Sequence, residues 1–459
     1  MKLRTFFVVV TMILSLGSCV KKDLPLQPLV LPLSLKSATI QPGNGMVPNE
    51  LLVKFKGGVD ENTKDGVLRK IGGKRKEKIL TEVMQRGGDN QGLAVVSMPG
   101  KIEDAIAAIK LLSDVEYVEP NYIYTHQSVS NDPYYGYLWG MFGTKTIPAN
   151  QYGSQAAVAW AAGHTGSDAV YIGLIDEGYM YTHEDLIANA GSNPGEIPGN
   201  GIDDDGNGYI DDVYGWDFVS GDNTVFDGVE DDHGTMVAGI MGAVGGNGIG
   251  VAGVCWNVKI LNAKFLGPNG GTLANAIKAI DYFTNLKLKG VNIVATNNSW
   301  GGGGFSQGLK DAIERANKAN ILFVAAAGND GMNTEFTPSY PSGYPNKNII
   351  AVASINSVGA LSYFSNYAAS KVDLCAPGEY IASCYPVLQS DGNYGSSYAI
   401  SSGTSLAAPF VTGAAALYAA THPNVKAEEI KGAIMDATTE MHSLEGKCES
   451  QGRLNISHF

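Results

Sequence analysis

The chain has 459 residues, of which 44% are hydrophobic and 17% charged, and this balance excludes a disordered chain. No uninterrupted apolar run of about 18 residues follows the first twenty positions, which excludes a polytopic membrane protein. The 32 basic and 45 acidic residues give a net charge of −13, which argues against nucleic acid as a partner.

The N-terminus has the pattern of an export signal. Lys2 and Arg4 precede a short apolar stretch, and small residues lead up to Cys19. The sequence around Cys19 resembles a bacterial lipobox, which implies cleavage before this residue and lipid attachment to its thiol. We therefore expect a signal peptide at 1–18, a proline-rich tether at 19–45, and an exported protein that is lipid-anchored to a bacterial membrane, on its periplasmic face or at the cell surface. The alternative is an ordinary secretory signal with an incidental cysteine.

A small α+β unit is predicted for residues 46–126. The apolar runs 51–55, 93–98 and 115–122 are typical of strands. The charged stretch between the first two runs is typical of a helix, and a second helix is expected from 102 to 112. The order strand, helix, strand, helix, strand favours a small α+β sandwich.

Residues 127–459 have the pattern of an α/β domain. Short apolar runs without alternation are typical of strands buried on both faces, and they lie at 170–175, 258–265, 291–295, 321–327 and 349–354. Helical patterns lie at 235–243, 273–288 with Thr272 as N-cap, 307–319, 407–420 and 428–437. This alternation predicts a parallel sheet covered by helices on both faces, with functional groups at the carboxyl ends of its strands.

Three side chains fall at such positions. Asp176 ends the first of these strands, His233 stands at the start of a helix, and Ser405 starts another. Each alone is more often a cap or a surface residue. Together they supply a nucleophile, the base that takes its proton and the carboxylate that orients the base. The order Asp, His, Ser is also one of the known chain orders of a catalytic triad.

The segments around these residues resemble the three signature blocks of the subtilisin family of serine proteases. They read Leu-Ile-Asp-Glu-Gly at 174–178, His-Gly-Thr-Met-Val-Ala-Gly at 233–239 and Ser-Gly-Thr-Ser-Leu-Ala-Ala-Pro at 402–409. The resemblance implies an α/β fold with a parallel-sheet, subtilisin-like peptidase domain at 127–459, preceded by an inhibitory propeptide domain at 46–126. The chain departs from the family pattern at Glu177, Met236 and Leu406, and none of these changes removes a proton carrier or donor.

The same resemblance assigns further site residues. It implies that Asn329 donates to the oxyanion, together with the backbone N–H of Ser405. It also implies that the segment after Asn298 binds extended substrate, through Ser299, Trp300, Gly301 and Gly302. The alternative for Trp300 is a plain core position.

Carboxylates are concentrated in one part of the chain. Residues 176–232 hold 16 of them and no lysine or arginine, so cations or solvent must balance the charge. One run of residues has the spacing typical of a looped calcium site, namely Asp203, Asp205, Asn207, Tyr209 and Asp211. Asp212 is a possible substitute ligand. Asp217, Asp222 and Thr224 resemble a calcium loop of the family. A further site is suggested by Asp185 with Asn247 and the carbonyls of Ile249 and Val251. We expect structural Ca²⁺ in at least one site, and the alternative is a solvated acidic loop.

Four cysteines lie beyond Cys19, namely Cys255, Cys375, Cys384 and Cys448. An exported protein can oxidise them, and their three possible pairings stay open. No Cys-x-x-Cys spacing occurs, which argues against zinc.

These features predict a monomeric serine endopeptidase that forms an acyl-enzyme. It is made as a zymogen, and its expected partners are polypeptide substrates, its own propeptide and, through Cys19, a membrane. Two alternatives remain: a catalytically silent member of the same fold that binds peptides, and an enzyme that hydrolyses esters or transfers acyl groups to amines.

Overall fold

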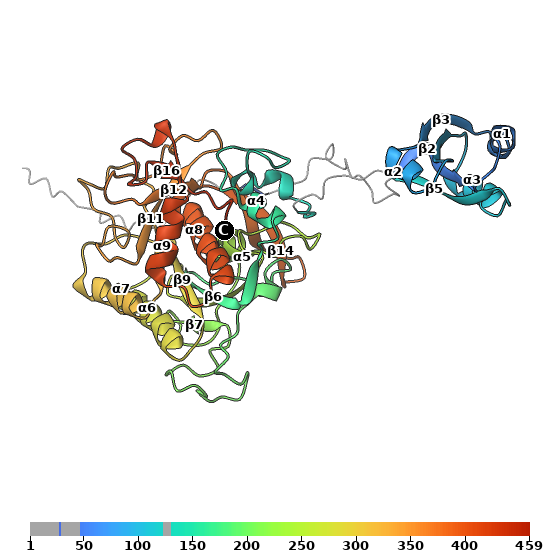
Figure 1. Ribbon diagram of the computed structural model, residues 1–459. Coiled ribbons are helices and arrows are strands. Elements are labelled where there is room, and N and C mark those ends of the chain that lie inside the picture. Colours follow the sequence, from blue (N-terminus) through green and yellow to red (C-terminus); the bar gives the residue numbers. More distant parts are fainter. Residues whose placement is uncertain (1–26, 29–45, 123–129) are drawn as a thin grey trace, which may run out of the picture. The chain divides into compact units, whose positions relative to one another are not determined.

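The computed structural model describes residues 27–28, 46–122 and 130–459. The described residues form two compact units, one within 46–122 and one within 130–459 (Figure 1). The expected signal peptide, the lipidation site Cys19 and nearly all of the tether lie outside the described residues. Within the described part of the chain, we find no helix that is both long and apolar enough to cross a membrane.

The N-terminal unit is a four-stranded antiparallel sheet with helices against it. Its elements, in chain order, are β2 (Met46–Phe55), α1 (Glu61–Arg69), β3 (Lys74–Ile79), α2 (Glu82–Arg86), β4 (Leu93–Ser97), α3 (Ile102–Ile109) and β5 (Val115–Tyr122). The strand order is β3-β4-β2-β5. Buried Leu51 and Val53 of β2 pack against Leu68 of α1 and Ile109 of α3. The small α+β architecture is as predicted.

One element of this unit differs from the prediction. The charged stretch between the first two apolar runs is not purely helical, because β3 lies within it. This strand is at the edge of the sheet and four of its six residues are exposed, so its sequence has no apolar alternation. Charged residues on an edge strand discourage pairing with other chains. The helical stretch is therefore split into α1 and α2.

The second unit is built on a nine-stranded sheet of order β15-β16-β12-β11-β10-β9-β6-β8-β7. The strands that form its parallel part are β6 (Gly166–Asp176), β7 (Gly215–Asp217), β8 (Asn257–Lys264), β9 (Ile293–Asn298), β10 (Leu322–Ala326), β11 (Ile349–Ile355), β12 (Leu374–Pro377) and β16 (Gly452–Arg453). The short β15 (Thr439–Glu440) pairs with β16 in the antiparallel sense. All five predicted strands of this domain are present.

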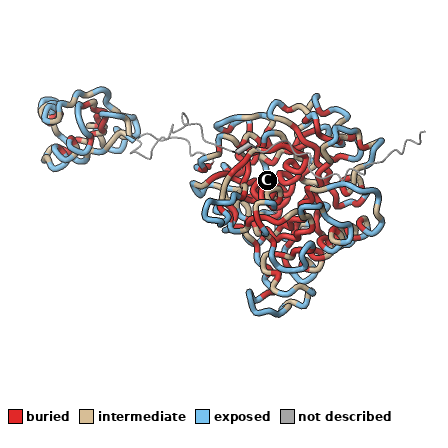
Figure 2. The backbone as a smooth tube through the Cα atoms, turned by 180° about the vertical axis from the view of Figure 1, so that it is seen from behind, coloured by how far each residue is buried: buried red, intermediate tan, exposed pale blue. Residues whose placement is uncertain are grey.

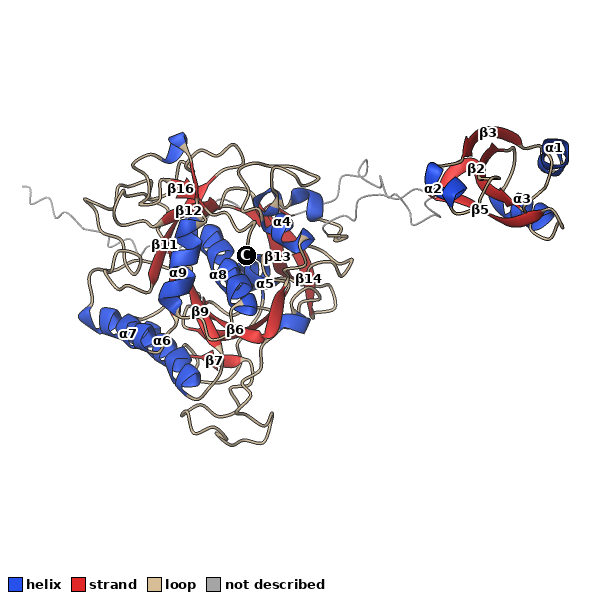
Figure 3. Cartoon of the chain, viewed as in Figure 1, coloured by secondary structure: helices blue, strands red, loops and turns tan. Residues whose placement is uncertain are grey.

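Helices cover both faces of the sheet (Figures 1 and 3). They are α4 (Ala156–Ala161), α5 (Asp232–Gly242), α6 (Leu273–Leu288), α7 (Gln307–Lys318), α8 (Thr404–Thr421) and α9 (Ala427–Asp436). Ile172 and Leu174 of β6 face the core that contains α5 and α8, whereas Ile175 faces the core of α6 and α7. Figure 2 shows the buried interior that results. Because both faces of β6 are covered, residues 170–175 form an apolar run without alternation.

Two parts of this unit were not anticipated. An antiparallel hairpin of β13 (Ile381–Leu388) and β14 (Tyr394–Ser401) lies outside the main sheet, and β1 (Gln27–Pro28) pairs with its β14 edge. The C-terminal residues 439–459 return to the sheet and add β15 and β16 at the edge beside β12. We call these residues the C-terminal strap.

Candidate active site

The proposed acid and base are in direct contact. Asp176 is the last residue of β6 and is fully buried, and His233 lies in the first turn of α5. The distance between His233 Nδ1 and Asp176 Oδ1 is 2.7 Å. The same carboxylate oxygen accepts the backbone N–H of Glu177 at 2.7 Å. A hydrogen bond from Nδ1–H to the carboxylate leaves Nε2 of His233 as the proton acceptor.

Lys264 and Asp231 fix the start of the helix that carries His233. Asp231 is the N-cap residue of α5, and its Oδ1 accepts the backbone N–H of Gly178 at 3.1 Å. The Lys264 ammonium, almost fully buried, lies 2.7 Å from the same oxygen and 2.6 Å from Asp227. Burial alone would lower the pKa of Lys264, but the two carboxylates outweigh burial and raise it. Sequence analysis missed this lysine because a single cation within an apolar strand carries no motif.

Ser405 lies in the first turn of α8 and is 4% exposed. Pro409 stands four residues later and has no N–H, so the helix offers no donor to the Ser405 carbonyl. Ser299 Oγ donates to this carbonyl instead, at 2.7 Å. Ser299 Oγ in turn accepts from Asn297 Nδ2 at 2.8 Å, and Thr412 Oγ1 donates to Asn297 Oδ1 at 2.9 Å. The first turn of α8, which carries the nucleophile, is therefore held by side chains at the end of β9 and directly after it.

The Ser405 hydroxyl itself has no hydrogen-bond partner among the described residues. Catalytic hydrogen bonds are often long or poorly aligned in a protein without substrate.

Asn329 is oriented by the residue before the nucleophile. Its Oδ1 accepts the backbone N–H of Thr404 at 2.8 Å and the Thr404 hydroxyl at 2.9 Å. These two bonds fix the orientation of the amide group, and its Nδ2 is the atom that can donate to a reacting group. Gly328 has a φ of +104°, and a Cβ there would lie 2.4 Å from Asn366 Nδ2, so the turn before Asn329 requires glycine.

The segment 299–302 leads from a buried strand end to the surface. Ser299 is buried, Trp300 is half-buried, and Gly301 and Gly302 are exposed. Trp300 packs edge to face on Phe265 with ring centroids 4.9 Å apart, so part of its side chain contacts the core and part is exposed. The exposed glycines follow the carboxyl end of β9, and the backbone N–H of Gly302 donates to the Tyr340 carbonyl at 3.1 Å.

The predicted site around Asp185 gains a residue that sequence analysis missed. Asp185 is fully buried and accepts Asn247 Nδ2 and the backbone N–H of Val251. Asp132, also buried, accepts the backbone N–H groups of 246–248. Burial raises the pKa of Asp185 to about 7, and the charge of Asp132 adds to the effect. No described lysine or arginine pairs with either carboxylate, so the pair fits a bound cation.

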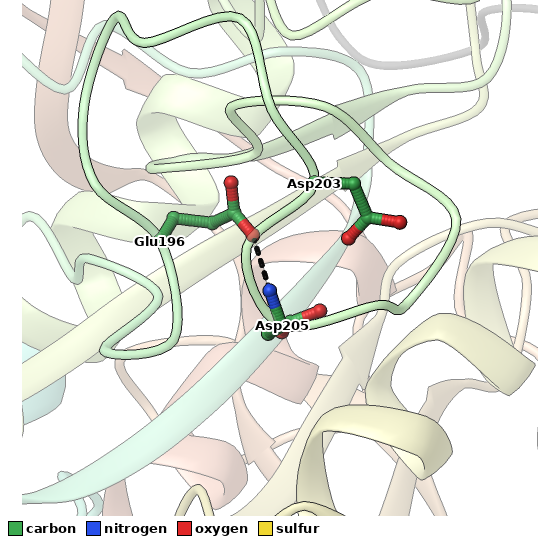
Figure 4. A group of neighbouring side chains, drawn as sticks. All are labelled: Glu196, Asp203 and Asp205. Carbon is green, nitrogen blue, oxygen red and sulfur yellow. Dashed lines mark hydrogen bonds between the residues drawn. The ribbon is translucent and has the colours of Figure 1, made fainter.

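The acidic loop brings together only some of its predicted ligands. One oxygen each of Asp203, Asp205 and Glu196 lie within 4.8 Å of one another (Figure 4). Glu196 was not predicted, because it precedes the spaced motif. Asp211 is turned toward the backbone N–H groups of 199–201, and Asp212 accepts from Asn193, Asn207 and Tyr282. Tyr209 packs its ring on Trp216, Phe218 and Tyr282.

The third predicted site contains an unsatisfied oxygen. Asp217 is fully buried, and its Oδ2 has no hydrogen-bond partner among the described residues. Asp222 lies beside it through a backbone bridge and accepts both the N–H and the hydroxyl of Thr224. A buried carboxylate oxygen without a partner is costly, and a cation would satisfy it.

Comparison with known proteins agrees with this geometry. Residues 167–453 match the Subtilase family, and residues 34–121 match the fervidolysin N-terminal prodomain. The chain is 33% identical to a thermophilic serine proteinase of Bacillus sp. (strain AK1), over 89% of this chain and 86% of the relative. It is 35% identical to thermitase of Thermoactinomyces vulgaris, over 71% of this chain and 96% of the relative. A protease structure from Pseudoalteromonas arctica aligns with a TM-score of 0.55 at 28% identity, and the alignment covers 72% of this chain and 98% of that one.

The chain therefore belongs to the subtilase family. It is a subtilisin-like serine protease with an N-terminal prodomain.

The contact between Ser299 and the Ser405 carbonyl leads to a testable rescue. Ser299→Ala should lower kcat about tenfold with little change in KM, because a buried carbonyl left without a donor costs about 1–3 kcal/mol and displaces the nucleophile's turn. The double variant Ser299→Ala/Pro409→Ala should recover activity, since an alanine in place of the proline supplies the missing helical N–H. The measurement is steady-state kinetics on a peptide substrate. A rise in KM without a fall in kcat would instead mean that the hydroxyl binds substrate.

Proposed function

We propose that this protein is an exported, lipid-anchored serine endopeptidase, made as a zymogen and stabilised by calcium. The observation that carries the catalytic part of the proposal is the Asp176–His233 hydrogen bond at the start of α5, a helix that packs against the nucleophile's helix α8. The prodomain match supports the zymogen.

The proposed reaction proceeds through an acyl-enzyme. Ser405 Oγ attacks the peptide carbonyl while His233 Nε2 takes its proton, and Asp176 holds the imidazole in the required tautomer. Asn329 Nδ2 and the backbone N–H of Ser405 donate to the oxyanion. His233 then gives the proton to the leaving amine, and water releases the acyl group by the reverse sequence.

Polypeptide is the substrate class that the site suits best. The exposed main chain at Gly301 and Gly302 follows a strand end, where an extended peptide can add as a further strand. Ser299 and Trp300 would form the inner wall of this binding segment. Among the relatives, the protein of Dichelobacter nodosus is named an extracellular basic protease, which supports export of this chain too. That protein is 33% identical, and the chain spans half of its length.

The N-terminal unit, residues 46–126, is the proposed inhibitor of the peptidase domain, residues 127–459. Its basic and acidic residues are balanced in number, whereas the peptidase domain is strongly acidic, and this contrast favours docking. The extended strand β5 ends at Tyr122 and precedes the proposed cleavage segment. The tail after it would occupy the active site before cleavage.

Calcium is proposed at the three groups of carboxylates described above. The strongest support comes from two observations. No described lysine or arginine pairs with the buried carboxylates of Asp185 and Asp132, and the buried Oδ2 of Asp217 has no hydrogen-bond partner among the described residues. Bound Ca²⁺ would supply positive charge that neutralises these oxygens. The residues on this chain would supply carboxylate and carbonyl ligands, which are the ligands this ion prefers.

Removing the oxyanion donor tests the reaction. Asn329→Ala should lower kcat by about two to three orders of magnitude with KM nearly unchanged, because the donor acts on charge present only in the transition state. The magnitude is taken from subtilisin, in which a side-chain donor of this kind has that effect. A fluorophosphonate probe should label Ser405 in the wild type. Absence of labelling in the folded protein would favour a catalytically silent peptide binder.

Removing calcium tests the metal sites. A chelator should lower the melting temperature and accelerate self-digestion, since a ligand that binds only the native state stabilises it by mass action. Asp185→Asn should weaken the response to calcium, and Asp203→Asn/Asp205→Asn should do so independently at the acidic loop. Melting is measured by calorimetry in a Ser405→Ala background, so that autolysis does not interfere. Equal melting with and without chelator would contradict bound calcium and would leave the acidic loop as a solvated surface.

Self-processing tests the zymogen. Ser405→Ala should accumulate as the uncut chain, whereas the wild type should be cut between about Thr125 and Asn131, because only a segment outside helices and strands can enter the active site. The measurement is N-terminal sequencing of both proteins expressed side by side. Processing of the variant at the same bond, with no other protease present, would rule out self-cleavage. Full activity of an uncut wild type would make the N-terminal unit an accessory domain.

A further inference from the structure

Two of the four described cysteines lie side by side. Cys375 is on β12 and Cys448 lies in the C-terminal strap. Each has at most 1% of its surface exposed. The two sulfur atoms are 3.6 Å apart, with Cys375 donating to Cys448. No other pair of described cysteines is in sulfur–sulfur contact. Cys255 instead contacts the carbonyl oxygen of Asn257, and Cys384 packs beside Gly239.

The strap that carries Cys448 is held by buried apolar side chains and by polar contacts to the main chain. Arg453 is 4% exposed, its guanidinium donates to the carbonyls of Gly153 and Gln151, and no described carboxylate pairs with it. Burial lowers the pKa of Arg453 to about 10. Beside it, the backbone N–H of Leu454 donates to the Cys375 carbonyl at 2.8 Å.

We propose that Cys375 and Cys448 form a disulfide in the exported protein, and that this bond fastens the C-terminal strap to β12. The inference rests on the export that we propose for this chain, because disulfides persist in oxidising compartments. A disulfide needs its sulfurs about 2.0 Å apart. The two thiols already face each other, so side-chain rotation within the site can close the remaining gap.

The oxidant is a small-molecule or protein disulfide. The thiolate of Cys448 attacks one of its sulfurs and releases one thiol, which forms a mixed disulfide. The thiol of Cys375 then loses its proton to solvent and attacks the Cys448 sulfur, which expels the second thiol. Two cysteine thiols are oxidised and one disulfide is reduced to two thiols. Either thiol can attack first, with the roles of the two cysteines exchanged in these steps. Because both thiols are buried, exchange precedes final docking of the strap.

The bond would enclose the nucleophile. The two cysteines are 73 positions apart, and the segment between them contains α8 with Ser405. The Gly378 carbonyl, just beyond β12, accepts the backbone N–H of Gly403 at 2.8 Å. Fastening the strap to β12 thus supports the strand end on which the turn of Ser405 rests.

Differential alkylation with peptide mapping tests the pairing. The full Ser405→Ala chain is prepared twice: exported with its own leader in a bacterial host, and refolded in a buffer of oxidised and reduced glutathione. We expect a Cys375–Cys448 linked peptide in both, with Cys255 and Cys384 alkylated without reduction. The proposal would be overturned if Cys375 and Cys448 stayed reduced in the glutathione buffer, or if either formed a disulfide with a different cysteine. A link in glutathione alone would support the pairing and contradict export, independently of any protease activity.

Thermal unfolding tests the effect of the bond on stability. Dithiothreitol should lower the melting temperature of the linked protein by on the order of 5–10 °C. The variant Cys375→Ala/Cys448→Ala should melt at the lower temperature with or without reductant. Cys384→Ala is the matched control, since it removes a buried thiol elsewhere and should keep the response to reductant. An equal response in the double variant would contradict the stabilising role.

Discussion

The hydrogen bond between Asp176 and His233 joins two elements whose residues lie 57 positions apart, and both of its ends depend on the same strand ladder. Strand β6 delivers the carboxylate and is held on both sides by β8 and β9. Lys264 is the register partner of Asp176 on β8, and its ammonium binds Asp231 at the start of α5. The ladder that fixes the carboxylate therefore also fixes the cation that holds the histidine's helix. Displacing β8 would disturb both groups at once.

The nucleophile and the oxyanion donor are likewise coupled through short contacts. Thr404 binds the amide oxygen of Asn329, and the carbonyl of the next residue, Ser405, is held by Ser299. These partners follow the ends of β9 and β10, which are neighbours in the sheet. The first turn of α8 is thus fixed by side chains from the strands below it, because Pro409 removes the helical donor that would otherwise serve. Because Pro409 leaves the Ser405 carbonyl without a helical donor, this carbonyl is free to bond to Ser299 at the end of the sheet.

Much of the peptidase domain could be predicted from the sequence, because strands buried on both faces and amphipathic helices leave strong patterns. Helix α6 begins after Thr272 as expected, and the Thr272 side chain caps the helix. The β13–β14 hairpin and the charged edge strand β3 were missed, since neither lies between two packed layers. At the site, motifs led to Asp176, His233, Ser405 and Asn329. Lys264, Asp132 and Glu196 have no local pattern, and their roles follow only from partners that are distant in the sequence.

The N-terminal arm of the peptidase domain links the proposed maturation to the proposed metal site. Asp132 lies just after the link in which we expect cleavage, and its carboxylate binds the backbone of 246–248, the loop that also carries Asn247. Tyr134 N–H donates to the Gly250 carbonyl in the same loop. The arm is therefore held by contacts that lie on the peptidase side of the expected cleavage segment. Burial raises the pKa of both Asp132 and Asp185, and the charge of Asp132 further destabilises the ionised form of Asp185. A cation bound between them would remove this repulsion, so the ion that stabilises the fold would also retain the new N-terminus.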